Sequence, residues 1–455
     1  MPPPDITAPL QTPIAQACMA CLVLLLALPL AIEVRKIPKR LLVLMATAFV
    51  DMVGLLILVP LVPFYVLKFA PLGVHLGSYH IDTGQLSALV QVAFTITQSI
   101  SSPIWGRFAD RKGRKPALLA ALAMAALAYL VFGFAHSLWL LALSRIVQGA
   151  GGGTVGVIQA YVADTTKPED RAKALGWLSA ATNLGVSLGP IIGHYAFSLR
   201  NVDLIPGDSV WVMGDAAPGI VASCICVLNL LFAAYWLTES NTTRLTRPQK
   251  SAAPSKRAAL QVITNPRALT SRLIWTYAIA IGSQQGVNVV LSLFLGMRHG
   301  VTESTVGYFW TYLGAISVFA RVLLLGRMLD RFGEAKLSRL GIVTLAVGLG
   351  SLPFAESLPT LAFAVGLIPL GTAFTFPCVT GLLSKVIDPA DRGFYMGLQQ
   401  TYGGITRIVG PLFFGLIYDH LSPGAPYLFA AGFVLTTLLL GSGFEQFSRT
   451  RKTSA

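Results

Sequence analysis

Long uninterrupted runs of apolar residues alternate with short polar segments along almost the whole chain. Each run has close to the ~20 residues that an α-helix needs to cross the hydrocarbon core of a bilayer. Lipid offers backbone groups no hydrogen-bond partner, so such runs fold as helices, and their length and apolar continuity exclude barrel strands. We therefore predict twelve membrane-spanning helices, at 41–67, 85–106, 116–135, 138–163, 173–198, 216–237, 273–296, 304–326, 338–356, 359–384, 393–418 and 426–446.

A further apolar run, 10–32, precedes these twelve segments. It has no basic start, which disfavours a signal peptide, and Pro29 and Glu33 weaken its C-terminal end. The alternatives are a thirteenth span, an interfacial helix, or a translated leader upstream of the true start. We favour a peripheral or accessory helix.

Lysine and arginine gather in alternate connecting segments, and this pattern sets the orientation of the helices. The inner segments hold most of the 34 basic residues, whereas only Lys68, Arg200 and Arg298 fall in outer segments. Both ends of the twelve-helix core are therefore expected in the cytoplasm. The net charge of +14 then faces the anionic inner leaflet, and we expect no nucleic-acid partner.

Composition narrows the class further. The chain is 54% hydrophobic and 12% charged, which excludes a soluble protein of 455 residues. All five cysteines lie within apolar runs, as small hydrophobic residues do. The sequence has no Walker loop, HExxH motif or nucleophile elbow. We expect no enzymatic activity, no cofactor and no bound metal, and an ion gradient as the energy source.

The two halves of the chain resemble each other. Gly106–Gly113 recurs as Gly326–Gly333, and Gly189-Pro190 recurs as Gly410-Pro411. Half-chain repeats indicate a secondary transporter that alternates access to a central site. The predicted fold is an all-α membrane protein with two six-helix pseudo-repeats. Its predicted parts are an N-terminal apolar segment with a basic flank, the first half, a cytoplasmic linker, the second half and a cytoplasmic tail, at 1–40, 41–237, 238–272, 273–446 and 447–455.

Three motifs carry a resemblance to a known family: a glycine- and arginine-rich loop after the second segment, an arginine followed by glycines in the fourth, and a glycine–proline pattern in the fifth. Their residues are Gly106, Asp110, Arg111, Gly113 and Arg114; Arg145, Gly149 and Gly151; and Gly176, Gly185, Gly189, Pro190 and Gly193. Over about residues 40–446 the chain resembles the twelve-helix drug–proton antiporters of the major facilitator superfamily. The resemblance implies export of small, lipophilic organic compounds in exchange for protons.

The loop motif is expected to act as a conformational latch. Its glycines permit a tight turn between two helices, and its charged residues at helix ends can form and break ion pairs. The alternative is a positive-inside loop with a helix cap. The predicted latch residues, including the copy in the second half, are Gly106, Asp110, Arg111, Gly113, Arg114, Asp330 and Arg331.

Asp51 is the clearest carboxylate within the twelve segments, and Arg145 lies within the fourth. Burial favours a neutral carboxyl group whereas a nearby guanidinium favours the ionised form, so a balanced group can bind and release a proton in each cycle. Placing an arginine at the centre of a membrane-spanning helix costs ~2.5–3.5 kcal/mol of insertion free energy. The resemblance implies that the arginine at this position, Arg145, takes part in proton coupling. We predict Asp51 as the proton carrier and Arg145 as its electrostatic partner. The alternatives are a capping or salt-bridged Asp51 and a structural Arg145.

The glycine–proline motif of the fifth segment favours export, because symporters of the resembled superfamily generally lack it. Its glycines permit close helix packing, and Pro190 bends the helix. The motif usually ends in a second glycine, where this chain has His194. A proton-linked symporter that imports a metabolite is therefore kept as the alternative. The third segment has no acidic residue, which disfavours the tetracycline-exporting families.

Polar and aromatic side chains within the segments are candidates for substrate contact. Gln91 and Gln98 share one helix face, and so do Gln284 and Asn288. Arg407 lies deep enough in its segment to meet an anionic substrate or a carboxylate. These candidates are Gln91, Gln98, Gln284, Asn288, Tyr402 and Arg407. The expected partners are a small-molecule substrate, protons and the lipid bilayer. We expect a monomer in a cell membrane, and short loops without a secretory leader suit a bacterial inner membrane.

Overall fold

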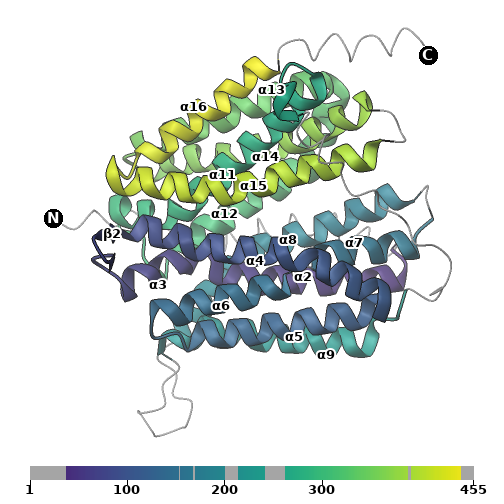
Figure 1. The fold of residues 1–455 in the computed structure, drawn as a ribbon, viewed down its shortest axis with the longest axis horizontal. Helices are drawn as coiled ribbons and strands as arrows, with labels where there is room; N and C mark the ends of the chain where they lie inside the picture. The colour runs from purple at the N-terminus through teal and green to yellow at the C-terminus, as the bar shows by residue number, and fades with distance from the viewer. Residues whose placement is uncertain are drawn as a thin grey trace, which may run out of the picture. The chain divides into compact units, whose positions relative to one another are not determined.

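The fold was analysed in a computed structural model that describes residues 37–152, 154–167, 170–199, 214–240, 262–387 and 391–441. Within these ranges the chain consists of α-helices and one two-stranded hairpin, as Figure 1 shows. The predicted all-α membrane fold is confirmed. The apolar run 10–32 lies outside the described residues.

The first half of the chain begins with α2, which continues through a 3₁₀ turn into α3, and a short hairpin then leads to α4. Its elements are α2 (Lys39–Leu58), η2 (Val59–Leu61), α3 (Val62–Phe69), β1 (Val74–Leu76), β2 (Tyr79–Ile81), α4 (Thr83–Lys112), α5 (Arg114–Gly133), α6 (Leu138–Gly151), α7 (Thr154–Thr165), α8 (Arg171–Ser198), η4 (Gly214–Ala216) and α9 (Ala217–Trp236). The strands β1 and β2 are antiparallel.

The second half is built from long helices with short connections. Its elements are α11 (Leu269–His299), α12 (Val306–Phe319), the π-helical turn η5 (Ala320–Leu324), α13 (Leu325–Ser351), η6 (Leu352–Phe354), α14 (Leu358–Val386), α15 (Arg392–His420) and α16 (Ala425–Leu440). Each of the twelve predicted segments coincides with one of these helices or with consecutive ones. Seven continuous helices in the described ranges are long and apolar enough to cross a membrane, and one of them, Val306–Phe354, contains two predicted segments.

Two glycines mark the repeated loop motif in the structure. Gly113 is the single residue between α4 and α5, with φ 112° and ψ 158°. Gly333 interrupts α13 with φ 71° and ψ 165°. Both φ values lie in the region that side-chain-bearing residues rarely adopt, so glycine allows each helix to change direction within one residue. The prediction of a tight glycine turn is confirmed at both copies.

The described residues of 1–246 and 292–318 form one compact unit. In it, α2 packs against α8 and α9, α5 packs against α6 and α9, and α4 packs against α6. The run of α5 beside α6 and α9 can be followed in Figure 1. On α12, Gly307 and Gly314 come close to Pro190 and Ser187 of α8.

The described residues of 247–291 and 319–455 form the second unit. In it, α13 packs against α14 and α16, and α15 packs against α14 and α16. The two units are groups of residues that contact one another, and residues 292–318, which belong to the predicted second half, contact the first unit. The predicted division into halves at 41–237 and 273–446 therefore stays a prediction.

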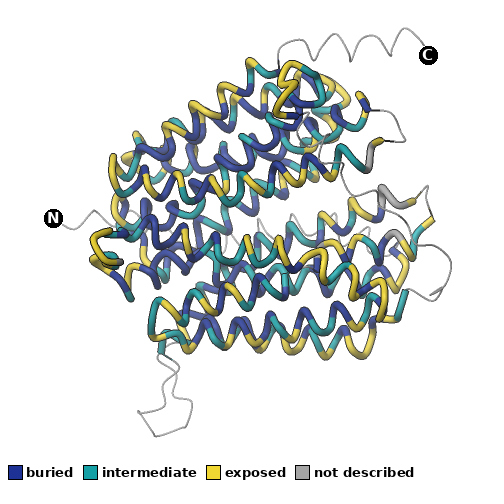
Figure 2. The backbone as a smooth tube through the Cα atoms, viewed as in Figure 1, coloured by how far each residue is buried: buried dark blue, intermediate teal, exposed yellow. Residues whose placement is uncertain are grey.

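Large apolar side chains lie exposed on the helices. Leu127, Leu228 and Phe363 are examples, and Figure 2 shows exposed positions recurring along helices whose other faces are buried. Trp139 near the start of α6 and Trp236 at the end of α9 are also exposed. An apolar surface of this kind suits lipid, with aromatic residues at the headgroup level.

The close approach of α2 and α8 explains the glycine motif. A Cβ added to Gly185, Gly189 or Gly193 would lie 2.5, 2.8 or 2.9 Å from the carbonyl oxygen of the facing residue. These residues are Phe49, Val53 and Ile57, one turn apart on α2. Three successive turns of α2 therefore lie against α8 with no space for a side chain, and this contact fixes the position of Asp51 between the first two.

The first prediction concerns this contact. Gly189→Ala places a methyl group 2.6 Å from Leu56 Cβ, so we expect overpacking to destabilise the protein by about 1–3 kcal/mol. The matched control is Gly176→Ala, because Gly176 belongs to the same motif and helix but has no atom within 4 Å of an added Cβ. Thermal unfolding of the purified protein should show a lower melting temperature for Gly189→Ala alone. Equal melting temperatures for the two variants would contradict this account of the motif.

Candidate functional site

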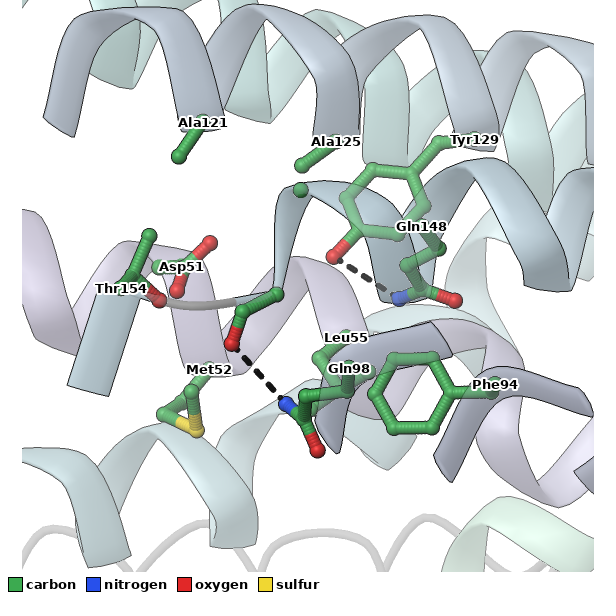
Figure 3. Close-up of a pocket in the computed structure, with 12 residues that line it drawn as sticks. Asp51, Met52, Leu55, Phe94, Gln98, Ala121, Ala125, Tyr129, Gln148 and Thr154 are labelled. Atoms are coloured by element: carbon green, nitrogen blue, oxygen red, sulfur yellow. Dashed lines mark hydrogen bonds between the residues drawn. The ribbon is translucent and has the colours of Figure 1, made fainter. Parts of the chain in front are cut away.

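Asp51 lines a small cavity inside the first unit. The cavity measures about 40 Å³, and since one water needs roughly 10–15 Å³ by this kind of measure, it holds a few waters and no drug-sized molecule. Figure 3 shows the lining side chains, which come from α2, α4, α5, α6 and α7. The lining residues are Asp51, Met52, Leu55, Phe94, Gln98, Ala121, Ala125, Tyr129, Gln148, Gly151, Gly152 and Thr154.

Asp51 is the only acidic residue in this lining. Its side chain is partly accessible, and within the described residues no hydrogen bond or ion pair holds its carboxylate. The alternative of a salt-bridged or capping Asp51 therefore has no support in the described part of the chain. A change in the protonation state of Asp51 would therefore break no ion pair with the described residues.

The side chains of α4 close the cavity by capping the end of α6. Gln98 Nε2 donates to the Gly152 carbonyl oxygen at 3.0 Å, and Ser101 Oγ donates to that of Gly149 at 2.9 Å. Trp105 Nε1 donates to the Ala150 oxygen at 2.6 Å. The last carbonyl groups of a helix have no partner within the helix, so these donors stabilise the break between α6 and α7. Gln98 thus lines the Asp51 cavity, and its amide nitrogen is bonded to the backbone; its predicted contact with substrate stays a prediction.

Arg145 is fully buried in α6. Its guanidinium carbon lies 4.9 Å from the centre of the Phe132 ring, a cation–π distance. Its Nε and Nη2 atoms are buried and have no hydrogen-bond partner in the described part of the chain. No ion pair joins it to Asp51. The structure therefore shows no contact between Asp51 and Arg145, and their electrostatic partnership stays a prediction.

Tyr129 lies between the neighbourhoods of Asp51 and Arg145. Its hydroxyl lies within electrostatic range of both Asp51 and Arg145, and it accepts a hydrogen bond of 3.3 Å from Gln148 Nε2. Figure 3 shows this bond at the edge of the cavity. The sequence analysis missed Tyr129 as a site residue. Its hydroxyl in an apolar helix was the available signal, but nothing in the sequence placed it beside Asp51.

The predicted latch residues meet only in part. Arg114 Nη1 pairs with Asp110 at 2.6 Å, and Arg114 Nε pairs with Asp164 at 3.1 Å. Gly113 forms the turn beside them, whereas Gly106 has no atom within 4 Å of an added Cβ and Arg111 is exposed. Asp164 was missed by the sequence analysis, because it ends a helix two segments further along the chain.

Glu239 caps the first turn of α5. One carboxylate oxygen accepts from the Arg114 N–H at 2.8 Å, and the other accepts from the Lys115 N–H at 3.1 Å. A side chain at Gly113 would collide with this carboxylate. A carboxylate at a helix N-terminus satisfies free N–H groups and interacts favourably with the helix dipole. The residue lies after α9, so no local sequence pattern could have identified it.

At the second copy of the loop motif, the ion pair is formed by residues other than the predicted Asp330 and Arg331. Neither Asp330 nor Arg331 forms an ion pair within the described ranges, and Arg331 lies 5.7 Å from the Phe332 ring centre. Glu334 instead pairs with Lys385 at 2.7 Å. In the repeat alignment these two residues correspond to Arg114 and Asp164, so the second unit keeps the ion pair with its polarity reversed.

The remaining substrate candidates fall into two groups. Gln91, Gln284 and Asn288 are half-buried on α4 and α11, and none of them lines the Asp51 cavity. Tyr402 is buried in an apolar cluster, edge-on to Trp275. Arg407 is half-buried on α15 and donates to the Tyr277 hydroxyl at 3.2 Å. The structure therefore brings Tyr402 and Arg407 into one aromatic region of the second unit.

Comparison with known proteins agrees with the fold. The sequence model of the Major Facilitator Superfamily matches residues 41–324 and 322–446. The chain is 27% identical over 354 residues to the tetracycline resistance protein, class B, of Escherichia coli, covering 77% of this chain and 84% of that protein. It is 27% identical over 424 residues to multidrug resistance protein 2 of Bacillus subtilis, covering 91% and 96%. The absence of an acidic residue in the third segment led us to disfavour the tetracycline-exporting families, and the similarity to tetracycline resistance proteins corrects that expectation.

Two solved structures share the fold. The human organic anion transporter MFSD10 (TETRAN) has a TM-score of 0.62 and 20% identity, with 89% of this chain and 99% of that chain covered. A bacterial homologue of the human lysosomal transporter Spinster, in an inward-facing and occupied conformation, has a TM-score of 0.68 and 15% identity, with 90% and 96% covered.

The second prediction concerns the cap on α5. Glu239→Ala removes both acceptors of the first turn, so we expect the protein to lose about 1–2 kcal/mol of stability. Glu239→Gln keeps one acceptor oxygen and should lose less. The control is Glu356→Ala, which removes an exposed carboxylate. Thermal unfolding distinguishes the variants, and a Glu239→Ala protein as stable as the control would refute the capping role.

Proposed function

The chain belongs to the Major Facilitator Superfamily, and we propose that it exports small, lipophilic organic compounds across the cytoplasmic membrane in exchange for protons. The observation that carries the proposal is the unpaired Asp51 carboxylate on a water-sized cavity among five helices. The membrane-spanning helical fold and a small-molecule substrate follow from the family. The proton, the direction of transport and the roles of individual residues are proposed.

Asp51 is the proposed proton carrier. A few waters in its cavity offer a path for a proton, while the space excludes a drug-sized compound. Ionised Asp51 in apolar surroundings is costly, so taking up one proton from the outer side converts the carboxylate into a neutral acid that the closed bundle tolerates. Release of that proton to the cytoplasm restores the charged form.

Arg145 is proposed to tune this equilibrium through space. The Tyr129 hydroxyl lies within electrostatic range of both groups, and a rearrangement that brings the guanidinium group closer to Asp51 would favour the ionised carboxylate. The two buried guanidinium nitrogens without partners are available to a rearranged Asp51 or Gln148 in another conformation. Arg145 is therefore the proposed electrostatic partner, acting without a permanent ion pair.

Coupling requires that the proton and the exported compound favour different states of the transporter, since a ligand shifts a conformational equilibrium only through differential binding. The contact between α2 and α8 ties the position of Asp51 to the helix that carries the glycine–proline motif. The charged network of Asp110, Arg114 and Asp164 is the proposed latch at the cytoplasmic ends.

Two observations favour export over import. The glycine–proline motif is of the antiporter kind, and its glycines make the close contact with α2. The relatives found by sequence are named for resistance to tetracycline or to many drugs. A proton-linked importer of a metabolite is the alternative. We further propose that the protein acts as a monomer in a bacterial inner membrane, with both ends of its core in the cytoplasm.

The third prediction tests proton coupling by Asp51. In inverted membrane vesicles, the wild-type protein should accumulate a lipophilic dye when a proton gradient is imposed, and an uncoupler should abolish accumulation. Asp51→Asn cannot release a proton, so its dye accumulation should fall to the level of vesicles without the protein. The measurement is dye fluorescence against time in each preparation.

The control for this experiment is Glu356→Gln, which neutralises an exposed carboxylate outside the cavity. It should transport as the wild type does. Dye accumulation that persists in Asp51→Asn and still requires the gradient would place the proton site elsewhere. A wild-type protein that moves no dye in these vesicles, but takes up a metabolite in whole cells, would establish the importer instead.

A further inference from the structure

Arg407 is an arginine deep within a membrane-spanning helix. It lies near the middle of α15, so about 20 Å of helix separates it from either end at 1.5 Å per residue. The helix is longer than the ~30 Å hydrocarbon core, so a residue near its middle lies ~15 Å from either headgroup layer when the helix is centred, which is beyond the reach of the side chain. Within the described ranges no carboxylate forms an ion pair with it. An intramembrane cation placed this way marks a functional site by default.

Tyr277 orients the guanidinium group without neutralising it. Its hydroxyl accepts a hydrogen bond of 3.2 Å from Arg407 Nη2. The Tyr277 ring is buried, packs edge-on against Phe376 at 5.4 Å between ring centres, and leaves only 2.8 Å to a Cβ added at Gly403. The ring therefore has little freedom, and it holds one nitrogen of Arg407 in a fixed direction while the others stay available.

The helix face beside Arg407 is polar and has space. Gly404 and Gln400 lie one and two turns earlier on the same face of α15. An added Cβ at Gly404 would have no atom within 4 Å, and Gln400 is exposed. A glycine and a glutamine next to an arginine do not suit lipid, whereas they leave room for a bound molecule beside the guanidinium group.

Aromatic side chains lie in the same part of the second unit. Tyr277 and Tyr402 belong to one apolar cluster, and Trp275 packs against this cluster, edge-on to Tyr402 at 5.2 Å. Flat aromatic rings provide large, rigid contact surfaces for a flat aromatic ligand. A planar guanidinium group binds a carboxylate through two parallel hydrogen bonds, which an ammonium group cannot match.

We propose that Arg407, oriented by Tyr277, binds the carboxylate of an aromatic acid carried by this transporter. The inference rests on the proposed function, because it names the class of compound that the transporter carries. Arg407 is the binding residue and Tyr277 a positioning residue. The acid group supplies the negative charge that the second unit does not supply to Arg407 among its described residues.

The test compares two probes that differ only in charge, 1-pyrenebutyrate and its neutral amide, 1-pyrenebutyramide. Binding to the purified full-length protein is measured by competition against a dye that the protein binds. We expect the wild type to bind the acid about tenfold more tightly than the amide, as one charged hydrogen-bonded pair supplies. Arg407→Gln should lose this preference and keep its affinity for the amide. Arg407→Lys and Tyr277→Phe should retain part of it.

Two controls separate the possible failures. Arg267→Gln removes an exposed positive charge of the same unit and Glu356→Gln removes an exposed negative charge of that unit, and both should keep the preference. Equal affinity of the wild type for both probes, a preference that survives in Arg407→Gln, or an equal loss of acid and amide binding would overturn the proposal. If acid-selective binding depends on Arg407 but vesicles show no proton-driven dye movement, the proposed function fails and this assignment stands.

Discussion

The cost of a charge within apolar helices is the constraint on which this structure depends. Asp51 has no ion pair among the described residues, and its carboxyl group faces a cavity that holds only a few waters. Ionisation there requires either water or a nearby positive charge. The cavity has space for a few waters beside Asp51, and the buried Arg145 lies within electrostatic range of Tyr129, as Asp51 does. This position is the reason why Asp51 is the proposed proton carrier.

The rest of the first unit keeps this position fixed. Glycines of α8 let α2 approach so closely that backbone atoms replace side chains at the contact. Donors from α4 satisfy the free carbonyl groups where α6 ends, and so permit an irregular backbone next to the cavity. Glu239 in turn fixes the start of α5, which carries Tyr129. A movement of any of these helices would change the surroundings of Asp51, and we propose that protonation and conformation are coupled in this way.

The sequence was informative wherever a physical rule acts locally. The length of each apolar run predicted the helices, and the glycines of the loop motif predicted both turns, at Gly113 and Gly333. Contacts between segments that lie far apart in the sequence could not be predicted from local patterns. Glu239 reaches the start of α5 from after α9, and Tyr129 meets the neighbourhood of Asp51 only through packing. The reversed pair of Glu334 and Lys385 shows that a repeat can conserve an interaction while exchanging its charges.

We propose that the exported compound binds the state in which Asp51 is ionised, so that binding of the compound and protonation of Asp51 exclude each other. The most direct measurement is proton release on binding: an exported dye is added to purified protein in weakly buffered detergent solution, and a pH indicator reports the protons set free. The account predicts about one proton released per dye bound by the wild type, and none by Asp51→Asn even where the dye still binds. Release of the same number of protons from both proteins would contradict it.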